Sequence, residues 1–406
     1  MYFSNLLINM TRSTFIKSLA LTPLISRLGA ILSCQFIDLK SQINEKVTID
    51  SIVLYKSMGQ VFLVVGANGK FGITQCNDRM PHLVSLLKGL VVYHFLGNDA
   101  KDLPKLVDNA YRLNSNYKYA GMPLWNCIGS VEIACWDLLG KIAQKPVYQL
   151  LGKQVRSDYG VYISDFNRDG DVEEIANTLK SKLEITGAKG VKVKVGGRMQ
   201  NTNENKAQTQ KYIPALRKIV GDDIIIYADA NGSFNQKEGI ETGRLLEDYG
   251  VEIFEEPCNF EDEDGIRAVT KALKKIKIAG GEQDSSVYRF ERLSKTNVYD
   301  ILQPDLYYNG GILRTLQVAE IAKEYKKFIA PHTPKADPVI APFWQFAAIT
   351  ENLYGLQECV YNPNEKPKNW FTPSIKIING KINIPNTIGL GIEYDSGIFK
   401  SAEKLI

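Results

Sequence analysis

The sequence predicts an α/β protein in which a parallel α/β barrel carries a capping domain of the α+β type. Between residues 158 and 362, short apolar segments alternate with helix-like stretches, and eight such strands with helices between them are typical of a closed parallel barrel. Before residue 76 the segments instead resemble strands joined by turns, and from residue 82 to about residue 151 apolar residues recur at helical spacing. The chain therefore contains two structural units.

The N-terminal unit is predicted to begin with three strands. They cover residues 47–55, 60–67 and 70–76, and Ala67-Asn68-Gly69 is a turn signal between the last two. Apolar residues then recur every three or four positions, which predicts helices. These helices cover residues 83–97, 102–114 and 128–144.

The barrel strands are expected at regular intervals after residue 158. A doubly wound sheet is the alternative, but no G-x-G-x-x-G loop follows a first strand, and Asn309-Gly310-Gly311 is typical of a turn. The eight predicted strands are residues 160–164, 190–195, 224–230, 252–257, 277–282, 300–305, 328–332 and 354–360.

The tail contains strand-like pieces, SIKIING and KINIP, and is expected to return to the N-terminal unit. The predicted domains are a possible leader over residues 1–36, a cap over 37–153, the barrel over 154–362, and a returning segment over 363–406.

The possible leader leaves the localisation open. Thr11-Arg12-Ser13-Thr14-Phe15-Ile16-Lys17 resembles a twin-arginine export signal in which Ser13 replaces the second arginine. The apolar stretch behind it is too short to span a bilayer, which needs ~20 apolar residues. We expect a cytoplasmic protein, or a periplasmic one if this degenerate signal is functional.

The composition excludes several classes of function. A net charge of +4 without a dense basic block argues against a nucleic-acid partner. The six cysteines contain no C-x-x-C pair, so they indicate neither a zinc site nor a disulfide framework. With only three histidines, any bound metal must be held mainly by carboxylates.

Polar residues recur at the carboxyl ends of the predicted strands, where barrels of this kind carry their active sites. Asp229, Glu255 and Glu282 lie on three adjacent strands, so their carboxylates are expected to converge on one hard cation, Mg²⁺. Strand alternation directs Glu256 to the opposite face, which makes it the poorer ligand candidate. Asn231 shares the face of Asp229 and is expected either to hydrogen-bond the site or to form a turn.

Two lysines and one histidine are the candidate acid–base groups. Lys192 and Lys194 are two residues apart and project to the same side, so each is expected to lower the pKa of the other and prepare one of them as a neutral base. His332 ends the seventh strand, and Asp305 one unit earlier is expected to orient its ring. His332 would then address the face of the substrate opposite to Lys194.

Six motifs in order, K-x-K, D-A-N, E-E-P, G-G-E, Q-P-D and P-H, together with SVEIACWDLLGKIAQKPVYQLLG, resemble the enolase superfamily. The resemblance is to its mandelate racemase-like subgroup and covers nearly the whole chain after residue 45. It implies a modified TIM barrel, (β/α)7β, capped by both ends of the chain. It also implies that Lys194 is the base and that Lys192 polarises the substrate carboxylate. Glu358, if protonated, would donate a hydrogen bond to the developing enolate.

The expected reaction is Mg²⁺-dependent removal of the proton α to the carboxylate of a small sugar acid, through an ene-diolate. Elimination would make the protein an aldonate or aldarate dehydratase, and ring opening a cycloisomerase of an anhydro-aldonate. Racemisation or epimerisation of a 2-hydroxy acid is the alternative, and a non-catalytic sugar-acid binding protein is a further one. Substrate choice is assigned to residues 56–59 and 76–82, with Lys335 either binding the substrate or solvated. A homo-oligomer is expected.

Overall fold

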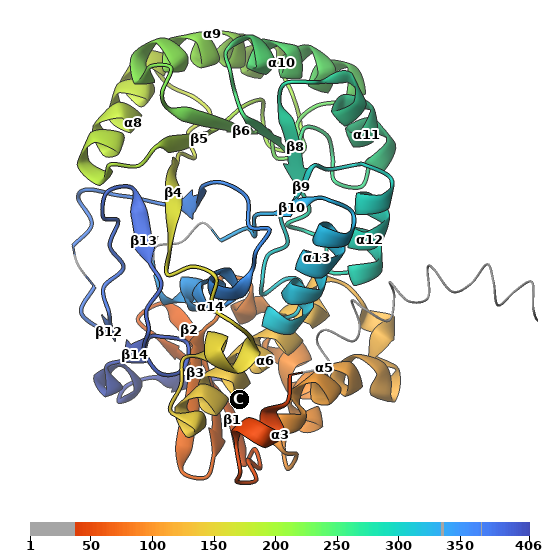
Figure 1. Cartoon of the computed structure of the whole chain (residues 1–406), viewed down its shortest axis with the longest axis vertical. Coiled ribbons are helices and arrows are strands. Elements are labelled where there is room, and N and C mark those ends of the chain that lie inside the picture. The colour runs from red at the N-terminus through yellow and green to blue at the C-terminus, as the bar shows by residue number, and fades with distance from the viewer. Residues whose placement is uncertain (1–36, 334–336, 367) are drawn as a thin grey trace, which may run out of the picture.

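The computed structural model describes residues 37–333, 337–366 and 368–406 (Figure 1). The predicted leader and Lys335 lie outside these residues. Within them, no helix is long and apolar enough to cross a membrane.

The upper part of the molecule in Figure 1 is a parallel barrel. In the described residues its strands follow the order β10-β9-β8-β7-β6-β5-β4-β11. The amide of Ile329 donates to Asn352 O at 3.1 Å and the amide of Tyr354 to Ile329 O at 2.8 Å, which links β10 to the segment just before β11. The strands are β4 (Asp158–Ser164), β5 (Gly190–Lys194), β6 (Ile225–Asp229), β7 (Ile253–Glu255), β8 (Lys277–Gly280), β9 (Ile301–Leu302), β10 (Phe328–Ile329) and β11 (Gln357–Cys359).

One helix follows each barrel strand except the last, so the predicted (β/α)7β architecture is confirmed. The helices form the outer ring of the barrel in Figure 1. They are α8 (Val172–Thr186), α9 (Asn203–Val220), α10 (Gln236–Asp248), α11 (Glu263–Ala272), α12 (Val287–Lys295), α13 (Ile312–Glu324) and α14 (Ala341–Ile349).

Side chains from alternate strand positions fill the barrel. Tyr162, Tyr227, Ile253, Ala279 and Ile301 form one buried cluster. Because side chains alternate along a strand, the positions two residues further on point to the same interior. This periodicity directs the polar residues at the strand ends toward the barrel axis.

The cap is built around an antiparallel sheet and a long helix. β1 (Ser51–Ser57), β2 (Gln60–Ala67) and β3 (Lys70–Gln75) pair in sequence, and α6 (Met122–Ala143) packs on them. Gly72 permits this close approach, since a Cβ there would lie 2.0 Å from Ala134 O. The other cap helices are α3 (Leu39–Gln42), α5 (Leu103–Arg112) and α7 (Val147–Leu151).

The tail joins both units. β13 (Lys381–Asn383) pairs with β4 of the barrel, and β15 (Glu403–Lys404) adds an antiparallel edge to β1. Ser57 also donates a hydrogen bond to Ile398 O at 2.6 Å. Between these contacts, β12 (Phe371–Thr372) pairs with β14 (Glu393–Tyr394).

Two buried carboxylates of α6 hold the cap against the rest of the chain. Glu132 accepts hydrogen bonds from the amides of Ile312 and Leu313, both at 3.0 Å, at the start of α13, and from the indole of Trp136 at 2.7 Å. Burial raises the pKa of Glu132 to about 7, although all three donors oppose this rise. Asp137 accepts from the amides of Ile73 and Leu390.

Two predicted elements are wrong in detail. The helix expected over residues 83–97 is divided into α4 (Val84–Leu86), a π-helical turn at Leu87–Val91 and a 3-10 turn at Val92–His94. The side-chain amide of Asn116 donates to Leu90 O at 2.7 Å there, taking a carbonyl that a regular helix would use.

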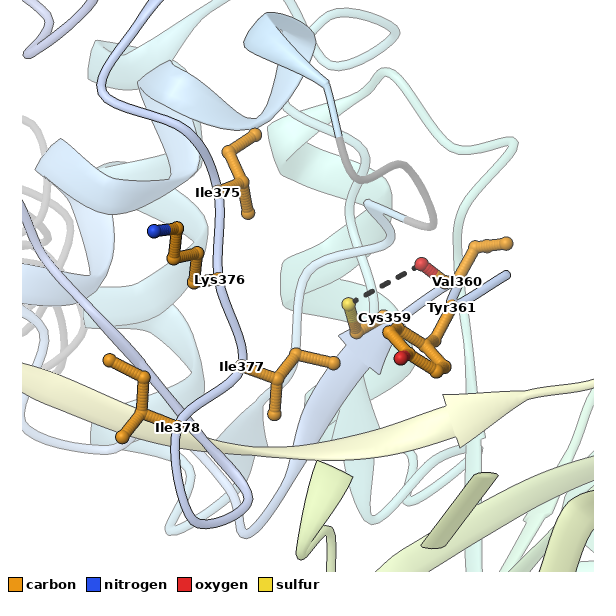
Figure 2. Close-up of a pocket in the computed structure, with 7 residues that line it drawn as sticks. All are labelled: Cys359, Val360, Tyr361, Ile375, Lys376, Ile377 and Ile378. Atoms are coloured by element: carbon orange, nitrogen blue, oxygen red, sulfur yellow. Dashed lines mark hydrogen bonds between the residues drawn. The ribbon is translucent and has the colours of Figure 1, made fainter. Parts of the chain in front are cut away.

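The second wrong prediction is a strand in the segment SIKIING. Residues Ile375–Ile378 of this segment lie outside the named strands. This segment instead borders a small cavity of about 280 Å³, with Cys359, Val360 and Tyr361 on the other side (Figure 2). Ile375 and Ile377 pack against the core rather than in a sheet, and Ile378 is exposed.

Candidate active site

A cavity of about 400 Å³ lies at the carboxyl ends of the barrel strands, between the barrel and the cap. The barrel contributes residues that follow β4 to β10, and the cap contributes Met122 and the loop of residues 77–79. The residues that line it include Arg79, Asn231, Glu256, Glu282, Asp305 and His332. Lys192, Lys194, Asp229 and Glu255 are buried beside it and do not line it.

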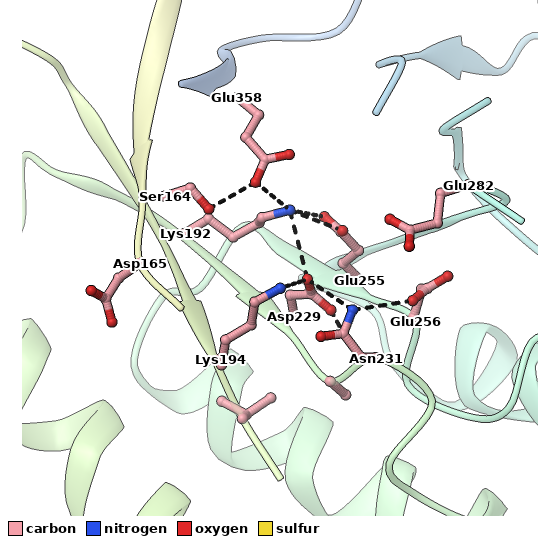
Figure 3. Close-up of polar contacts among 12 residues, drawn as sticks. Ser164, Asp165, Lys192, Lys194, Asp229, Asn231, Glu255, Glu256, Glu282 and Glu358 are labelled. Carbon is pink, nitrogen blue, oxygen red and sulfur yellow. Dashed lines mark hydrogen bonds and ion pairs between the residues drawn. The ribbon is translucent and has the colours of Figure 1, made fainter. Parts of the chain in front are cut away.

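Lys192 lies at the centre of the buried group. Its Nζ is 3.0 Å from Glu255 Oε1, 3.0 Å from Glu358 Oε1 and 3.6 Å from Asp229 Oδ2 (Figure 3). Burial alone would lower the pKa of Lys192, but the charges of these carboxylates outweigh it and hold the pKa well above its usual value. The predicted lowering of this pKa is therefore wrong for Lys192, because the carboxylates lie closer than the sequence alone could show.

Lys194 lies next to Lys192 and pairs with Asp229 (Figure 3). Both lysines project from β5 to the same side, as predicted. The ammonium of Lys194 also lies 5.4 Å from the centre of the Phe166 ring. One wall of this part of the site is therefore aromatic and the other anionic.

His332 is held between two carboxylates. Its Nδ1 is 3.0 Å from Asp305 Oδ2, and its Nε2 is 3.3 Å from Glu282 Oε2. Burial acts to lower the pKa of His332, but Glu282 and Asp305 together raise it to about 10. The predicted pairing of His332 with Asp305 is present. Glu282, predicted as a metal ligand, is also a neighbour of this histidine.

Glu358 is ionised rather than protonated in this arrangement. Its burial acts to raise the pKa of the carboxyl group, but Lys192 and His332, with a 2.7 Å hydrogen bond from Ser164 Oγ, lower it below its usual value. The expectation that Glu358 donates a hydrogen bond is therefore not met by the structure. It accepts one instead.

Glu256 turns toward the site, which corrects the prediction from strand alternation. Strand β7 ends at Glu255, and Glu256 has a φ of 46°, so the alternation of a strand no longer applies to it. Its Oε2 accepts from Asn231 Nδ2 at 3.4 Å, and its buried Oε1 has no hydrogen-bond partner. Burial, followed by the charges of Glu282 and Asp229, raises the pKa of Glu256 well above its usual value.

Acidic side chains outnumber basic ones in the group around Lys192, Lys194 and His332. Six carboxylates, Asp229, Glu255, Glu256, Glu282, Asp305 and Glu358, accompany Lys192, Lys194 and His332. Among the described residues, no three carboxylates, histidines or cysteines are already grouped closely enough to hold a metal. The unpartnered Oε1 of Glu256 and the all-oxygen donor set nevertheless fit a hard divalent cation such as Mg²⁺. Asp229, Glu255 and Glu282 are the residues that would hold it, with Glu256 adjacent.

Arg168 was missed by the sequence analysis. Its guanidinium donates to Val195 O at 3.0 Å, to Gly196 O at 2.9 Å and to Asn231 Oδ1. This contact fixes the side-chain amide of Asn231, so its Nδ2 faces Asp229 at 3.3 Å as well as Glu256. No motif marks Arg168, because its role depends on the path of the loop after β4.

Gln303, the glutamine of the Q-P-D motif, was also given no role. Its Nε2 donates to Glu255 Oε2 at 3.0 Å, so Glu255 is fixed from two sides, by Lys192 and by Gln303.

Comparisons with known proteins agree with this geometry. The family model described as Enolase C-terminal domain-like matches residues 174–398. The arabinonate dehydratase of Saccharolobus solfataricus is 28% identical over 328 residues, which are 80% of this chain and 84% of that one. The D-galactarolactone cycloisomerase of Agrobacterium fabrum is 27% identical over 74% of this chain and 79% of its own.

A solved structure shows the same fold. The mandelate racemase/muconate lactonizing protein of Paracoccus denitrificans, complexed with magnesium, superposes with a TM-score of 0.81 at 22% identity. The match covers 88% of this chain and 98% of that one.

Proposed function

The chain belongs to the enolase superfamily, within its mandelate racemase-like subgroup, and on this premise we propose that it is a Mg²⁺-dependent sugar-acid dehydratase. It is an enzyme, either a lyase or an isomerase. The proposed reaction removes the proton α to the substrate carboxylate and then expels a hydroxyl group from the β carbon. The substrate is an aldonic or aldaric acid.

One observation carries this proposal: two groups capable of proton transfer occupy opposite sides of the barrel mouth. Lys194 comes from β5 and His332 follows β10, and in the described sheet four strands separate these two on one side and two on the other. A substrate bound between them presents one face to each group. This is the arrangement that abstraction on one face and proton donation on the other requires.

The chain's own residues divide the reaction between them. Lys192 attracts the substrate carboxylate, and Lys194 accepts the α proton after leaving its ion pair with Asp229. His332, oriented by Asp305, then donates a proton to the departing hydroxyl group. Bound Mg²⁺, held by Asp229, Glu255 and Glu282, would add positive charge beside the ene-diolate oxygens.

The relatives support elimination and keep ring opening as a close variant. One is a dehydratase and another a cycloisomerase, and both outcomes share proton abstraction followed by loss of a β oxygen. Racemisation is the second candidate, because two proton-transfer groups on opposite faces also permit return of the proton from the other side.

The test is incubation of the full chain with Mg²⁺ and a panel of sugar acids in D₂O. We expect a 2-keto-3-deoxy acid as product. Deuterium exchange at the α carbon without keto acid would replace the dehydratase with a racemase. Binding without exchange would contradict an enzymatic role for this site and leave a binding protein.

Two substitutions test the assigned roles. Lys194→Met and His332→Asn are each expected to lower turnover by about 10²-fold or more, the lower end for general acid–base groups. Lys211→Met, an exposed lysine on α9, is the matched control and should leave turnover unchanged. Unchanged turnover in both site variants would contradict the proposal.

A further inference from the structure

We infer that Arg79 forms a second anion-binding position in the cavity, so that the preferred substrate is a dicarboxylate, an aldaric acid, rather than an aldonic acid. The inference rests on the proposed function and specifies its substrate class. It depends on the cap loop that places Arg79 at the cavity. It also depends on the neighbours of the Arg79 guanidinium and on how far they lie from His332.

The loop that carries Arg79 is fixed on both sides. Asn77 Oδ1 accepts the backbone amide of Arg79 at 3.0 Å. The side-chain amides of Asn77 and Asn126 in turn donate hydrogen bonds to each other, at 3.2 and 3.1 Å, and Asn126 is a buried residue of α6. On the other side, Met80 is fully buried in the cap. The base of the Arg79 side chain is thus held by the cap core, although the side chain itself is exposed and lines the cavity.

The guanidinium of Arg79 lies beside Tyr308, which in turn stacks on the group that would donate the proton. Burial raises the pKa of the Tyr308 hydroxyl to about 12, and a hydrogen bond from Arg79 and its charge oppose this rise. The Tyr308 ring stacks against the ring of His332, with centroids 6.5 Å apart and planes inclined by 29°. Arg79 is therefore one aromatic ring away from His332, on the side of the cap.

Among the described residues, Arg79 also has no carboxylate counter-ion. No carboxylate within 4.0 Å forms an ion pair with its guanidinium in the described part of the chain. Lys192, Lys194 and His332 each have at least one carboxylate partner, whereas Arg198, which also lines the cavity, has none among the described residues. An exposed guanidinium on a fixed loop, facing a cavity, is suited to a planar carboxylate with two hydrogen bonds.

The two ends of an aldaric acid match the two ends of the site. With its first carboxylate at Lys192, the α carbon faces Lys194 and the β hydroxyl faces His332. The remaining carbons extend beyond His332 toward the cap, and the terminal carboxylate meets Arg79. An aldonic acid ends in a neutral hydroxymethyl group, which leaves the charge of Arg79 without a partner.

The experiment compares acids that differ only at this end: galactarate with galactonate, and glucarate with gluconate. We expect a higher kcat/KM for the diacid of each pair. Arg79→Met should lower kcat/KM for the diacid by about 10- to 100-fold, the range for a lost charged hydrogen bond, and leave the monoacid within about threefold. Arg79→Lys should restore part of the loss.

Arg198→Met is the matched control, because Arg198 lines the same cavity from the loop after β5 and has no ion pair among the described residues. We expect it to leave the diacid preference unchanged. An equal loss of preference in both variants would indicate a general effect of charge and overturn the inference. Preference for the monoacids, or an equal effect of Arg79→Met on both acids, would overturn it as well.

Calorimetric binding separates this inference from the proposed function. Tighter binding of galactarate than galactonate, abolished by Arg79→Met, supports the second anion position even if no keto acid forms. Dehydration of galactonate without recognition of galactarate supports the proposed function and overturns the inference. Turnover or binding of the monoacid by Arg79→Met also shows that the variant is folded.

Discussion

Asp305 is hydrogen-bonded to one ring nitrogen of His332, since its Oδ2 lies 3.0 Å from His332 Nδ1. Its other oxygen, Oδ1, accepts hydrogen bonds from the backbone amides of Tyr307 and Tyr308. The carboxylate is thus fixed by the turn after β9 before it meets the ring. The other ring nitrogen, Nε2, lies 3.3 Å from Oε2 of Glu282, a second residue that lines the cavity. We expect Asp305 to act through His332 as a positioning residue.

Asp305→Asn should therefore lower kcat by about 10²-fold or more, since an amide no longer selects the ring tautomer or stabilises the protonated ring. KM should change little, because Asp305 does not carry a substrate charge. Steady-state kinetics over pH 6–9 measure both effects and the shift of the alkaline limb of the profile to lower pH, since Asp305 raises the pKa of the acid His332. A variant that keeps the wild-type kcat and pH profile would contradict this role.

Removal of divalent metal should abolish activity and lower stability. The buried carboxylates repel one another, so a bound cation stabilises the folded state in proportion to RT ln(1 + [L]/Kd). A chelator followed by stepwise addition of Mg²⁺ should show parallel recovery of turnover and of the melting temperature. In Asp229→Asn, the Mg²⁺-dependent rise in melting temperature should be lost, whereas Lys211→Met should retain it.

Arg168→Met should weaken activation by Mg²⁺. Without the guanidinium, the Asn231 amide is free to turn its oxygen toward Asp229 and Glu256, which places like partial charges together. Hydrogen bonds that orient the residues around a metal ligand contribute about 10- to 100-fold to metal affinity or activity. The measurement is the Mg²⁺ concentration for half-maximal turnover, and Arg168→Lys should have an intermediate value. An unchanged value would show that Asn231 is fixed without Arg168.

Glu132 should make the stability of the protein depend on pH. Its folded-state pKa of about 7 is raised above the unfolded value, so the folded state binds the proton more tightly. Its contribution is fully present below about pH 4.3 and is lost as the pH rises through 7, by up to about 3 kcal/mol. The free energy of unfolding of the wild type should therefore fall relative to that of Glu132→Gln between pH 5 and pH 8. Parallel curves for the two proteins would contradict this.

The barrel could be predicted from the sequence because its signals are local and repeated. Each strand from 160–164 to 354–360 has an apolar core and a polar end, and the structure contains a strand at every one of these places. The pairing of Asp305 with His332 followed from the same repeat, since equivalent ends of neighbouring parallel strands lie side by side.

The electrostatics of the site could not be predicted in the same way. The position of Glu256 depends on a single positive φ angle, which strand alternation does not include. The pKa of Lys192 depends on distances of 3.0 Å to Glu255 and Glu358, and Glu358 lies on a strand more than 160 residues away in the sequence. Arg168 and Arg79 lie on loops, where composition gives no direction for the side chain.

The antiparallel pairing of β15 with β1 has a consequence for biosynthesis. The sheet that begins at residue 51 gains its edge only from residues 403–404, and the contact of Ser57 with Ile398 joins positions 341 residues apart. The whole barrel must therefore be synthesised before β15 can pair with β1. Until then one edge of β1 has no strand partner. Chaperone binding to nascent chains is expected to persist at this edge until residues 403–404 emerge, so the cap sheet is completed only after the barrel has been synthesised.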